Sequence, residues 1–190
     1  MMQIDRVLYP ITTLGPGKRL VIWTIGCKKE CPKCANPELW RKDAGKSIDV
    51  TDFVDMLKQS IGSQPIDGVT LTGGDPLEQP QELAKLLPLL RKYTDDILIY
   101  TGYILEEAIN ASTKEEWDVI KQHTSVLIDG PYIDGLNNSK CALRGSANQN
   151  IRFFDENKKE LYNSYLRNGP SIQNVFYAGK MISVGIHRRE

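Results

Sequence analysis

Three cysteines lie within eight residues of one another, and their spacing is the strongest chemical signal in the sequence. Cys27, Cys31 and Cys34 form the pattern Cys-x3-Cys-x2-Cys, whereas the fourth cysteine, Cys141, lies far along the chain. Four cysteines in 190 residues are too few for a disulfide scaffold. Three thiolates on one short loop suit a [4Fe–4S] cluster that is held at three irons, with the fourth iron open to another ligand.

A zinc site is the alternative interpretation of these cysteines. A structural zinc ion usually has four protein ligands, and this loop provides three. The fourth ligand would have to come from Cys141 or from one of the two histidines, His123 and His187. At this point the sequence leaves both interpretations open.

A second candidate site is the glycine-rich turn formed by Gly73, Gly74 and Asp75, directly after an apolar segment. Glycine has no Cβ, so the backbone there can approach a ligand closely. The Asp75 carboxylate and the free backbone groups beside it can hold the ammonium group of a substrate. Alone, this pattern is also that of an ordinary strand-to-helix turn. Together with the three-cysteine loop it indicates a binding site.

Predicted strands alternate with predicted helices and indicate how these loops are positioned. Apolar runs bounded by turn residues predict four strands, at residues 19–25, 69–72, 97–100 and 125–128. Such alternation implies parallel strands joined by helices. The cysteine loop, the glycine-rich turn and the loops that begin at Thr101 and Asp129 all leave strand carboxyl ends. We therefore expect all four loops to meet on one face.

Helical patterns lie between these strands. One helix is expected to begin near Thr51 as its N-cap. Another begins at Pro80 and carries a leucine stripe, with a kink or an early stop expected at Pro88. Beyond them, residues 150–154 predict a fifth strand, and residues 175–186 a sixth strand or a hairpin. We expect one domain over residues 1–190, in which about 150–190 form a C-terminal extension.

Composition excludes several classes of protein. The chain has 24 basic and 24 acidic residues, so it lacks the broad basic surface of a general nucleic-acid binder. No apolar run approaches the ~20 residues that a membrane span needs. The amino-terminal residues do not have the pattern of a signal peptide. We therefore expect a cytoplasmic protein with no nucleic-acid or membrane partner.

The ordered set of motifs resembles the radical S-adenosylmethionine (SAM) superfamily. The three-cysteine loop and residues 72–76 carry this resemblance. Within the superfamily, the chain is most similar to the activating proteins of anaerobic (class III) ribonucleotide reductases. The narrower resemblance spans about residues 9 to 149 and rests on further motifs: Tyr9-Pro10, Gly15-Pro16-Gly17, Gly26, Glu30, Pro32, Asn36, Trp40, Tyr100-Thr101-Gly102-Tyr103, Asp129-Gly130, Arg144-Gly145-Ser146 and Asn148-Gln149.

The resemblance implies a fold and a set of ligands. The fold would be α/β, a partial (β/α) barrel of the radical SAM type, with parallel strands and with the cluster and SAM at the carboxyl ends of the strands. Cys27, Cys31 and Cys34 would bind the [4Fe–4S] cluster, and SAM would chelate the open iron. Residues implied to bind SAM are Lys33, Cys34, Ala35, Gly73, Gly74 and Asp75. Residues implied to contact SAM or the partner are Asn36, Thr101, Asp129, Arg144 and Asn148.

The implied activity is that of a radical SAM oxidoreductase, an enzyme that activates a glycyl-radical enzyme. One electron from the reduced cluster cleaves SAM to methionine and a 5′-deoxyadenosyl radical. That radical removes a hydrogen atom from a glycine Cα of the partner, the anaerobic ribonucleotide reductase. The implied electron donor is a reduced flavodoxin or ferredoxin, which Lys28 and Lys29 could attract. No catalytic residue is implied beyond the cluster and SAM.

Two other functions compete with this hypothesis. The first is a radical SAM enzyme that acts on another glycyl-radical enzyme, a peptide or a small molecule. The second is a zinc-binding or electron-transfer module with no enzymatic activity. Individual residues also have plainer interpretations, since Arg144 and Asn148 can cap a loop and Cys141 can be a small buried apolar residue.

Overall fold

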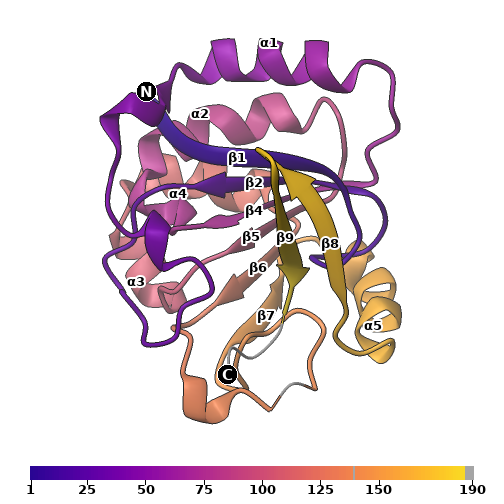
Figure 1. Ribbon diagram of the computed structural model, residues 1–190. Coiled ribbons are helices and arrows are strands. Elements are labelled where there is room, and N and C mark those ends of the chain that lie inside the picture. The colour runs from indigo at the N-terminus through magenta and orange to yellow at the C-terminus, as the bar shows by residue number, and fades with distance from the viewer. Residues whose placement is uncertain (139, 187–190) are drawn as a thin grey trace.

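The computed structural model describes residues 1–138 and 140–186 and shows an α/β fold built on one large sheet (Figure 1). The strand order in this sheet is β3-β1-β2-β4-β5-β6-β7. Four neighbouring strands are parallel: β2 (Arg19–Thr24), β4 (Gly68–Gly73), β5 (Ile97–Tyr100) and β6 (Val126–Asp129). They correspond to the four strands that the sequence predicts. The α/β class is therefore confirmed.

The expected parallel strands are confirmed for these four neighbours, but the strands at the two sides of the sheet run in the opposite direction. On one side, β1 (Met2–Ile11) pairs antiparallel with β2 and with the short β3 (Ser47–Ile48). On the other side, β7 (Asn150–Phe153) pairs antiparallel with β6. The described residues thus form a mixed sheet that does not close into a barrel.

The remaining elements cover the two faces of the sheet. The α-helices are α1 (Val50–Ile61), α2 (Pro80–Leu90), α3 (Leu105–Asn110), α4 (Lys114–His123) and α5 (Lys159–Arg167). A separate hairpin consists of β8 (Ile172–Tyr177) and β9 (Lys180–Gly185). Short 3-10 helices occupy the loops: Pro37–Leu39, Ala44–Lys46, Pro76–Glu78, Asp134–Leu136 and Glu156–Lys158. No helix in the described ranges has the length and apolar character needed to cross a bilayer.

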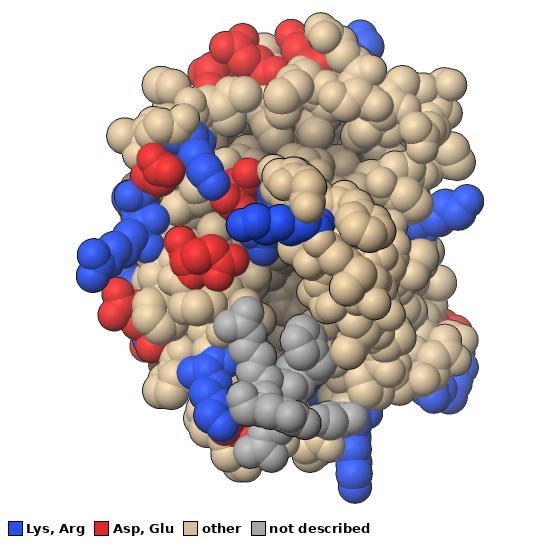
Figure 2. Space-filling model, in the orientation of Figure 1, with Lys and Arg blue, Asp and Glu red and all other residues tan. Residues whose placement is uncertain are grey.

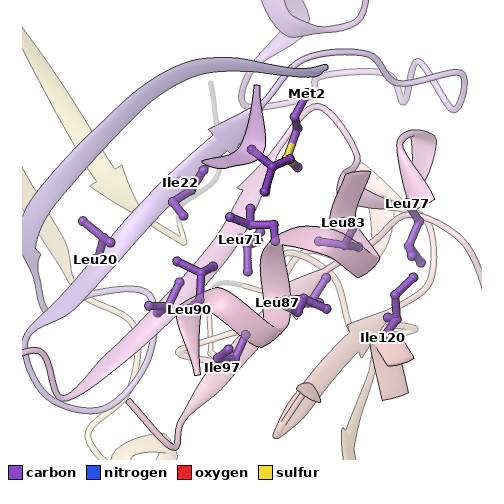
Figure 3. Packing of buried hydrophobic residues seen from close by; sticks show 14 of the residues in the cluster. Met2, Leu20, Ile22, Leu71, Leu77, Leu83, Leu87, Leu90, Ile97 and Ile120 are labelled. Atoms are coloured by element: carbon purple, nitrogen blue, oxygen red, sulfur yellow. The ribbon is translucent and has the colours of Figure 1, made fainter. Parts of the chain in front are cut away.

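One face of the sheet packs against α1, α2 and α4. Alternate residues of a strand point to the same face, so Leu20 and Ile22 of β2 lie on this side together with Leu71 of β4. Figure 3 shows these side chains directed toward the leucine stripe of α2. The labelled members of that stripe are Leu83, Leu87 and Leu90. This packing places the helices away from the opposite face.

The opposite face is covered by the hairpin and α5. Val21 and Trp23 of β2 pack against Val184 of β9, and Ile128 of β6 packs against Tyr162 of α5. In Figure 1 the hairpin crosses in front of the sheet, on the side away from α1 and α2. Both faces of the sheet are therefore buried, and its second face is covered by residues from the C-terminal part of the chain.

A buried ion pair ties α5 to the amino ends of the parallel strands. Arg19, which is 0% exposed, donates from Nη1 to Asp96 Oδ2 at 2.7 Å and from Nε to Thr70 Oγ1 at 2.6 Å. The Tyr162 hydroxyl donates to the other oxygen of Asp96 at 2.8 Å. A buried charge pair is stable only when its remaining hydrogen-bonding groups are also satisfied, and the Val69 carbonyl accepts a further bond from Arg19.

Two local expectations about the helices are wrong. The N-cap of α1 is Asp49 and not Thr51, because the Asp49 carboxylate accepts from the Thr51 backbone N–H at 2.7 Å. The early stop of α2 at Pro88 also does not occur, since the helix contains this residue and continues to Leu90, while the kink stays a prediction. The predicted fifth strand is confirmed as β7. The predicted hairpin is confirmed too, and it begins earlier, at Ile172.

Candidate functional site

A cavity of about 180 Å³ lies at the carboxyl ends of the parallel strands. Four loops, those that follow β2, β4, β5 and β6, contribute residues to its wall. Most of the lining residues come from these loops: Cys27, Lys29, Cys31, Lys33, Cys34, Ala35, Gly74, Asp75, Thr101, Gly102 and Tyr132. The loops that the sequence places at strand carboxyl ends are thus brought together in the structure.

Backbone hydrogen bonds to residues 39 and 40 fix the start of the loop that carries the cysteines. The Gly26 N–H donates to the Leu39 carbonyl at 2.8 Å, and the Cys27 N–H donates to the Trp40 carbonyl at 2.9 Å. Within the loop, Glu30 and Lys33 adopt positive φ angles of 42° and 57°. Non-glycine residues seldom adopt this left-handed conformation. These two tight turns fold the loop back on itself, so that all three cysteines line one cavity.

All four cysteines are free and half-buried. Burial raises the pKa of the Cys27 thiol to about 11 and raises the pKa of Cys31 in the same direction. Among the described residues, no group of three or more His, Cys, Asp or Glu side chains is arranged to hold a metal ion.

A [4Fe–4S] cluster asks for a different arrangement of ligands from that of a zinc ion. Each thiolate of a cluster binds a different iron, so the three sulfur atoms need to surround one cavity without converging on a point. Cys27, Cys31 and Cys34 all line the same cavity. Neither Cys141 nor His123 completes a metal-ligating group with them. The other histidine, His187, lies outside the described residues.

Gly74 lacks a side chain because the cysteine loop passes directly against it. A Cβ at Gly74 would lie 2.5 Å from the Gly26 carbonyl oxygen, and the Gly74 N–H donates to the Thr24 carbonyl at 2.8 Å. The neighbouring Gly73 has a φ of 109° and does not line the cavity. Gly74 therefore lets the turn after β4 pack against the cysteine loop, while a Cβ at Gly73 would lie 2.6 Å from the Thr24 backbone of β2.

Asp75 is 1% exposed, and its carboxylate is already hydrogen-bonded by the protein. It accepts from the Thr101 hydroxyl at 2.9 Å, from the Gly102 N–H at 2.8 Å and from the Leu77 N–H at 3.0 Å. Burial raises the pKa of Asp75 to about 6, although these hydrogen bonds act in the opposite direction. The carboxylate thus joins the loop after β4 to the loop after β5.

Asp75→Ala is expected to destabilise the protein by about 3 kcal/mol, because each buried donor left without an acceptor costs about 1–3 kcal/mol. Asp75→Asn keeps one acceptor oxygen and should lose less stability. Urea denaturation of the three proteins measures these differences. Asp55→Ala, at an exposed position on α1, is the matched control. Equal denaturation midpoints for Asp75→Ala and Asp55→Ala would contradict the role assigned to this carboxylate.

The same carboxylate should make stability depend on pH. The pKa of Asp75 in the folded protein, about 6, lies above its ordinary value of 3.8, so the folded state binds more protons between these values. Stability should therefore fall as the pH rises from about 4 to about 6, and it should change no further from this group above that range. Asp75→Asn should lack this part of the pH dependence.

The other residues implied by the resemblance lie in several places. Thr101 lines the cavity, and Asn36 lies beside it, where its side-chain oxygen accepts from Arg6 at 2.9 Å. Asp129 is buried and pairs with an arginine of β7 at 2.6 Å. Arg144 donates to the Gln149 carbonyl at 3.1 Å, and Asn148 donates to the Pro131 carbonyl at 2.8 Å. The last three do not line the cavity. Arg144 and Asn148 hold the loop that follows β6, and Asp129 joins β6 to β7.

Some cavity residues have a weaker signal in the sequence, or none. Gln149 belongs to the 144–149 stretch, whose polar side chains were expected to contact the partner, and it lines the cavity; its side-chain oxygen accepts from the Gly145 N–H at 2.8 Å while its amide donates to the Gly130 carbonyl at 2.9 Å. Gln149 and Gly145 stand within motifs that carry the family resemblance, so a signal was present. Gly185 and Ile186 reach the cavity from the end of the hairpin, and no local pattern indicates this.

Comparison with known proteins gives consistent matches. The family described as a 4Fe-4S single cluster domain matches residues 13–152. The anaerobic ribonucleoside-triphosphate reductase-activating protein of Escherichia coli (strain K12) is 34% identical over 149 residues, which cover 74% of this chain and 92% of the relative. The protein of the same name from Enterobacteria phage T4 is 32% identical over 155 residues, 79% of this chain and 93% of the relative. The protein of the same name from Pasteurella multocida is 35% identical over 149 residues, which cover 75% of this chain and 91% of the relative.

Proposed function

Because the chain belongs to the family of anaerobic ribonucleoside-triphosphate reductase-activating proteins, we propose that it generates a glycyl radical on an anaerobic ribonucleotide reductase. It is then an enzyme that uses a [4Fe–4S] cluster and SAM. The observation that carries the proposal is the cavity at the strand carboxyl ends. There the three cysteines lie beside the Gly74-Asp75 turn and the Thr101-Gly102 loop.

Each part of the cavity has a role in this proposal. Cys27, Cys31 and Cys34 hold the cluster, and the backbone around Lys33 and Ala35 lies against SAM. Gly74 lets the turn after β4 lie close to the same ligands, and Asp75 fixes that turn relative to the loop after β5. When bound, the reduced cluster and SAM would supply the radical chemistry that removes a hydrogen atom from a glycine Cα of the reductase.

The open sheet supports a macromolecular substrate. In the proposed fold, the four parallel strands form part of a radical SAM (β/α) barrel, and the antiparallel strands β1 and β7 end it on either side. A wall that does not close leaves one side of the site accessible to a loop of another protein. The proposal further assigns the chain to a single cytoplasmic domain that receives its electron from a reduced flavodoxin or ferredoxin and does not bind nucleic acid.

The decisive experiment is to form the radical on the reductase. Anaerobically reconstituted and reduced protein is incubated with SAM and the class III reductase of the same organism. We expect the electron paramagnetic resonance doublet of a glycyl radical. The matched control is a reductase in which the radical-bearing glycine is alanine, and this variant should give no doublet.

Two results would contradict the proposal. SAM cleavage that leaves no radical on the reductase, but modifies a peptide or a small molecule, would assign the activity to a different radical SAM enzyme. A colourless protein that binds one zinc ion and no iron would make it a zinc-binding module.

A further inference from the structure

One carboxylate, that of Glu78, holds the start of the cysteine loop. Glu78 ends the 3-10 helix that directly follows the Gly74-Asp75 turn. Its Oε1 atom accepts from the Lys28 backbone N–H at 3.1 Å, and its Oε2 atom lies 3.1 Å from the Lys28 ammonium. Lys28 is bonded directly to Cys27. A side chain from the loop after β4 thus fixes the residue that follows the first cysteine.

Tyr103, in the loop after β5, holds the same carboxylate from a third segment. Its hydroxyl donates to Glu78 Oε1 at 2.6 Å. The Lys29 ammonium lies over the Tyr103 ring, 4.6 Å from its centroid, and it pairs with Glu107 of α3 at 2.6 Å. The two lysines that follow Cys27 are therefore bound to the loop after β4 and to α3.

The segment that Glu78 fixes has a backbone conformation that needs support. Glu30 adopts a φ of 42° in this segment. A non-glycine residue in the left-handed region costs free energy and persists only where surrounding contacts hold it. Burial raises the pKa of Cys27 to about 11, and hydrogen bonding from the backbone of Lys29 and Glu30 acts in the opposite direction. The supported segment thus faces the sulfur atom of the first cysteine.

Burial distinguishes Glu78 from the charged groups around it. In Figure 2, acidic and basic side chains are interspersed at the left of the view, the side on which Figure 1 shows α3. Water screens such exposed charges. The Glu78 side chain is only 3% exposed, whereas that of its partner Lys28 is 83% exposed. Burial alone would raise the pKa of Glu78, but hydrogen bonds from Tyr103 and Lys28 lower it below its ordinary value, so the carboxylate is a buried negative charge.

A negative charge at this place bears on the reduction of a cluster. The reduction potential of an iron–sulfur cluster depends on nearby charge and on hydrogen bonds around its sulfur ligands. A cluster bound by Cys27 would gain negative charge on reduction close to Glu78, and like charges repel. Glu78 also stands outside the motifs that carry the family resemblance, so the resemblance assigns it no role.

We propose that Glu78 is a positioning residue for the [4Fe–4S] cluster. It holds the Cys27 side of the cysteine loop in its ligand-binding shape, and its buried negative charge makes the bound cluster harder to reduce. The Tyr103 hydroxyl orients the carboxylate for both roles. This inference rests on the cluster in the proposed function and does not depend on the identity of the partner.

Glu78→Gln tests the electrostatic role, because the carboxamide oxygen can still accept hydrogen bonds while the charge is lost. Full-length, cluster-loaded protein is titrated anaerobically at controlled potential, and visible absorbance reports the reduced fraction. We expect the midpoint potential of Glu78→Gln to be less negative than that of the wild type. Glu82→Gln, which removes a carboxylate that pairs with Lys85 on α2, is the matched control and should keep the wild-type potential.

Glu78→Ala tests the positioning role through amide hydrogen exchange. It removes the acceptor of the Lys28 N–H, so this amide should exchange about ten- to hundredfold faster. Glu78→Gln keeps an acceptor and should change the rate less. Mass spectrometry with fragmentation to single residues measures the exchange in the full-length protein, with and without the cluster. Thermal unfolding of each variant separates local opening of the loop from a loss of global stability.

Three results would overturn the inference. Equal midpoint potentials for Glu78→Gln and Glu82→Gln would remove the electrostatic role. Unchanged exchange at Lys28 in Glu78→Ala would show that the loop keeps its shape without the carboxylate. Lower thermal stability of both Glu78 variants with an unchanged potential would make Glu78 a structural residue only.

The outcomes also separate this inference from the proposed function. A shifted potential without a glycyl radical on the reductase would overturn the assigned partner and leave the role of Glu78 intact. A radical on the reductase, with Glu78→Gln at the wild-type potential, would overturn the inference alone. A wild-type protein that takes up no iron would overturn both.

Discussion

Alanine in place of Cys27, Cys31 or Cys34 is expected to abolish cluster assembly, so that each variant is purified as a colourless protein with little iron. Two remaining thiolates would leave two irons of the cluster without a protein ligand. All three side chains line the same cavity, so none of them is expected to be dispensable. Iron and sulfide content after anaerobic reconstitution, together with visible absorbance, measures the effect.

Cys141→Ala is the matched control for this experiment and should assemble the cluster normally. The Cys141 thiol accepts from Arg144 Nε at 3.4 Å and does not line the cavity. Burial alone would raise its pKa, but hydrogen bonds from Arg144 and from nearby backbone N–H groups lower the pKa below its ordinary value. If Cys141→Ala lost iron as completely as the other variants, the assignment of three cysteine ligands would be wrong.

Asp96→Ala is expected to bring the protein close to unfolding at room temperature. It leaves the Arg19 guanidinium, which is 0% exposed, without its carboxylate partner. Breaking a buried pair in this way costs about 3–5 kcal/mol. A typical domain is stable by only about 5–15 kcal/mol. Urea denaturation monitored by circular dichroism should show a large decrease in the midpoint, or no folded baseline at all.

Two further variants show whether the loss of stability comes from breaking the buried Arg19–Asp96 ion pair, and not from removing one hydrogen bond or any acidic side chain. Tyr162→Phe removes a single hydrogen bond to Asp96 and should cost about 1 kcal/mol. Asp118→Ala removes the acidic partner of an exposed ion pair with Lys114 on α4 and should leave stability nearly unchanged. A small effect of Asp96→Ala, similar to that of Asp118→Ala, would show that the buried pair is not a main determinant of stability.

The parallel core and the gathering of the loops could be predicted because their signals are local. Each buried parallel strand appears as a short apolar run that is followed within two residues by a glycine, and topology then brings the strand ends together. The first strand, β1, was missed because its alternation is interrupted. Its pairing with β2 shifts register between Ile4 and Arg6 and again between Leu8 and Ile11. Pro10 within the same segment is also atypical of a strand.

The detailed membership of the site could be predicted less well. Arg144 and Asn148 carry the polar groups that a ligand contact needs, but their side chains bond carbonyls of their own loop. A motif indicates that a residue matters in a family without indicating whether it contacts a ligand or holds a loop in shape. Tyr100 is the opposite case: it lines the cavity, although the sequence did not single it out as a site residue. Its environment depends on residues of the hairpin far along the chain, which a strand pattern cannot reveal.

The direction of β7 has a consequence for how this fold can grow during evolution. β7 begins at Asn150 opposite Asp129, beside the site, and ends at Phe153 opposite Val126, at the amino ends of the parallel strands. Residues added after β7 therefore start at the end of the sheet away from the cysteines and must cross one of its faces to return. The hairpin does so and ends with Gly185 at the cavity. Changes to residues after β7 are thus expected to alter the cover over the cavity, while the parallel strands that carry the cysteine loop stay unchanged.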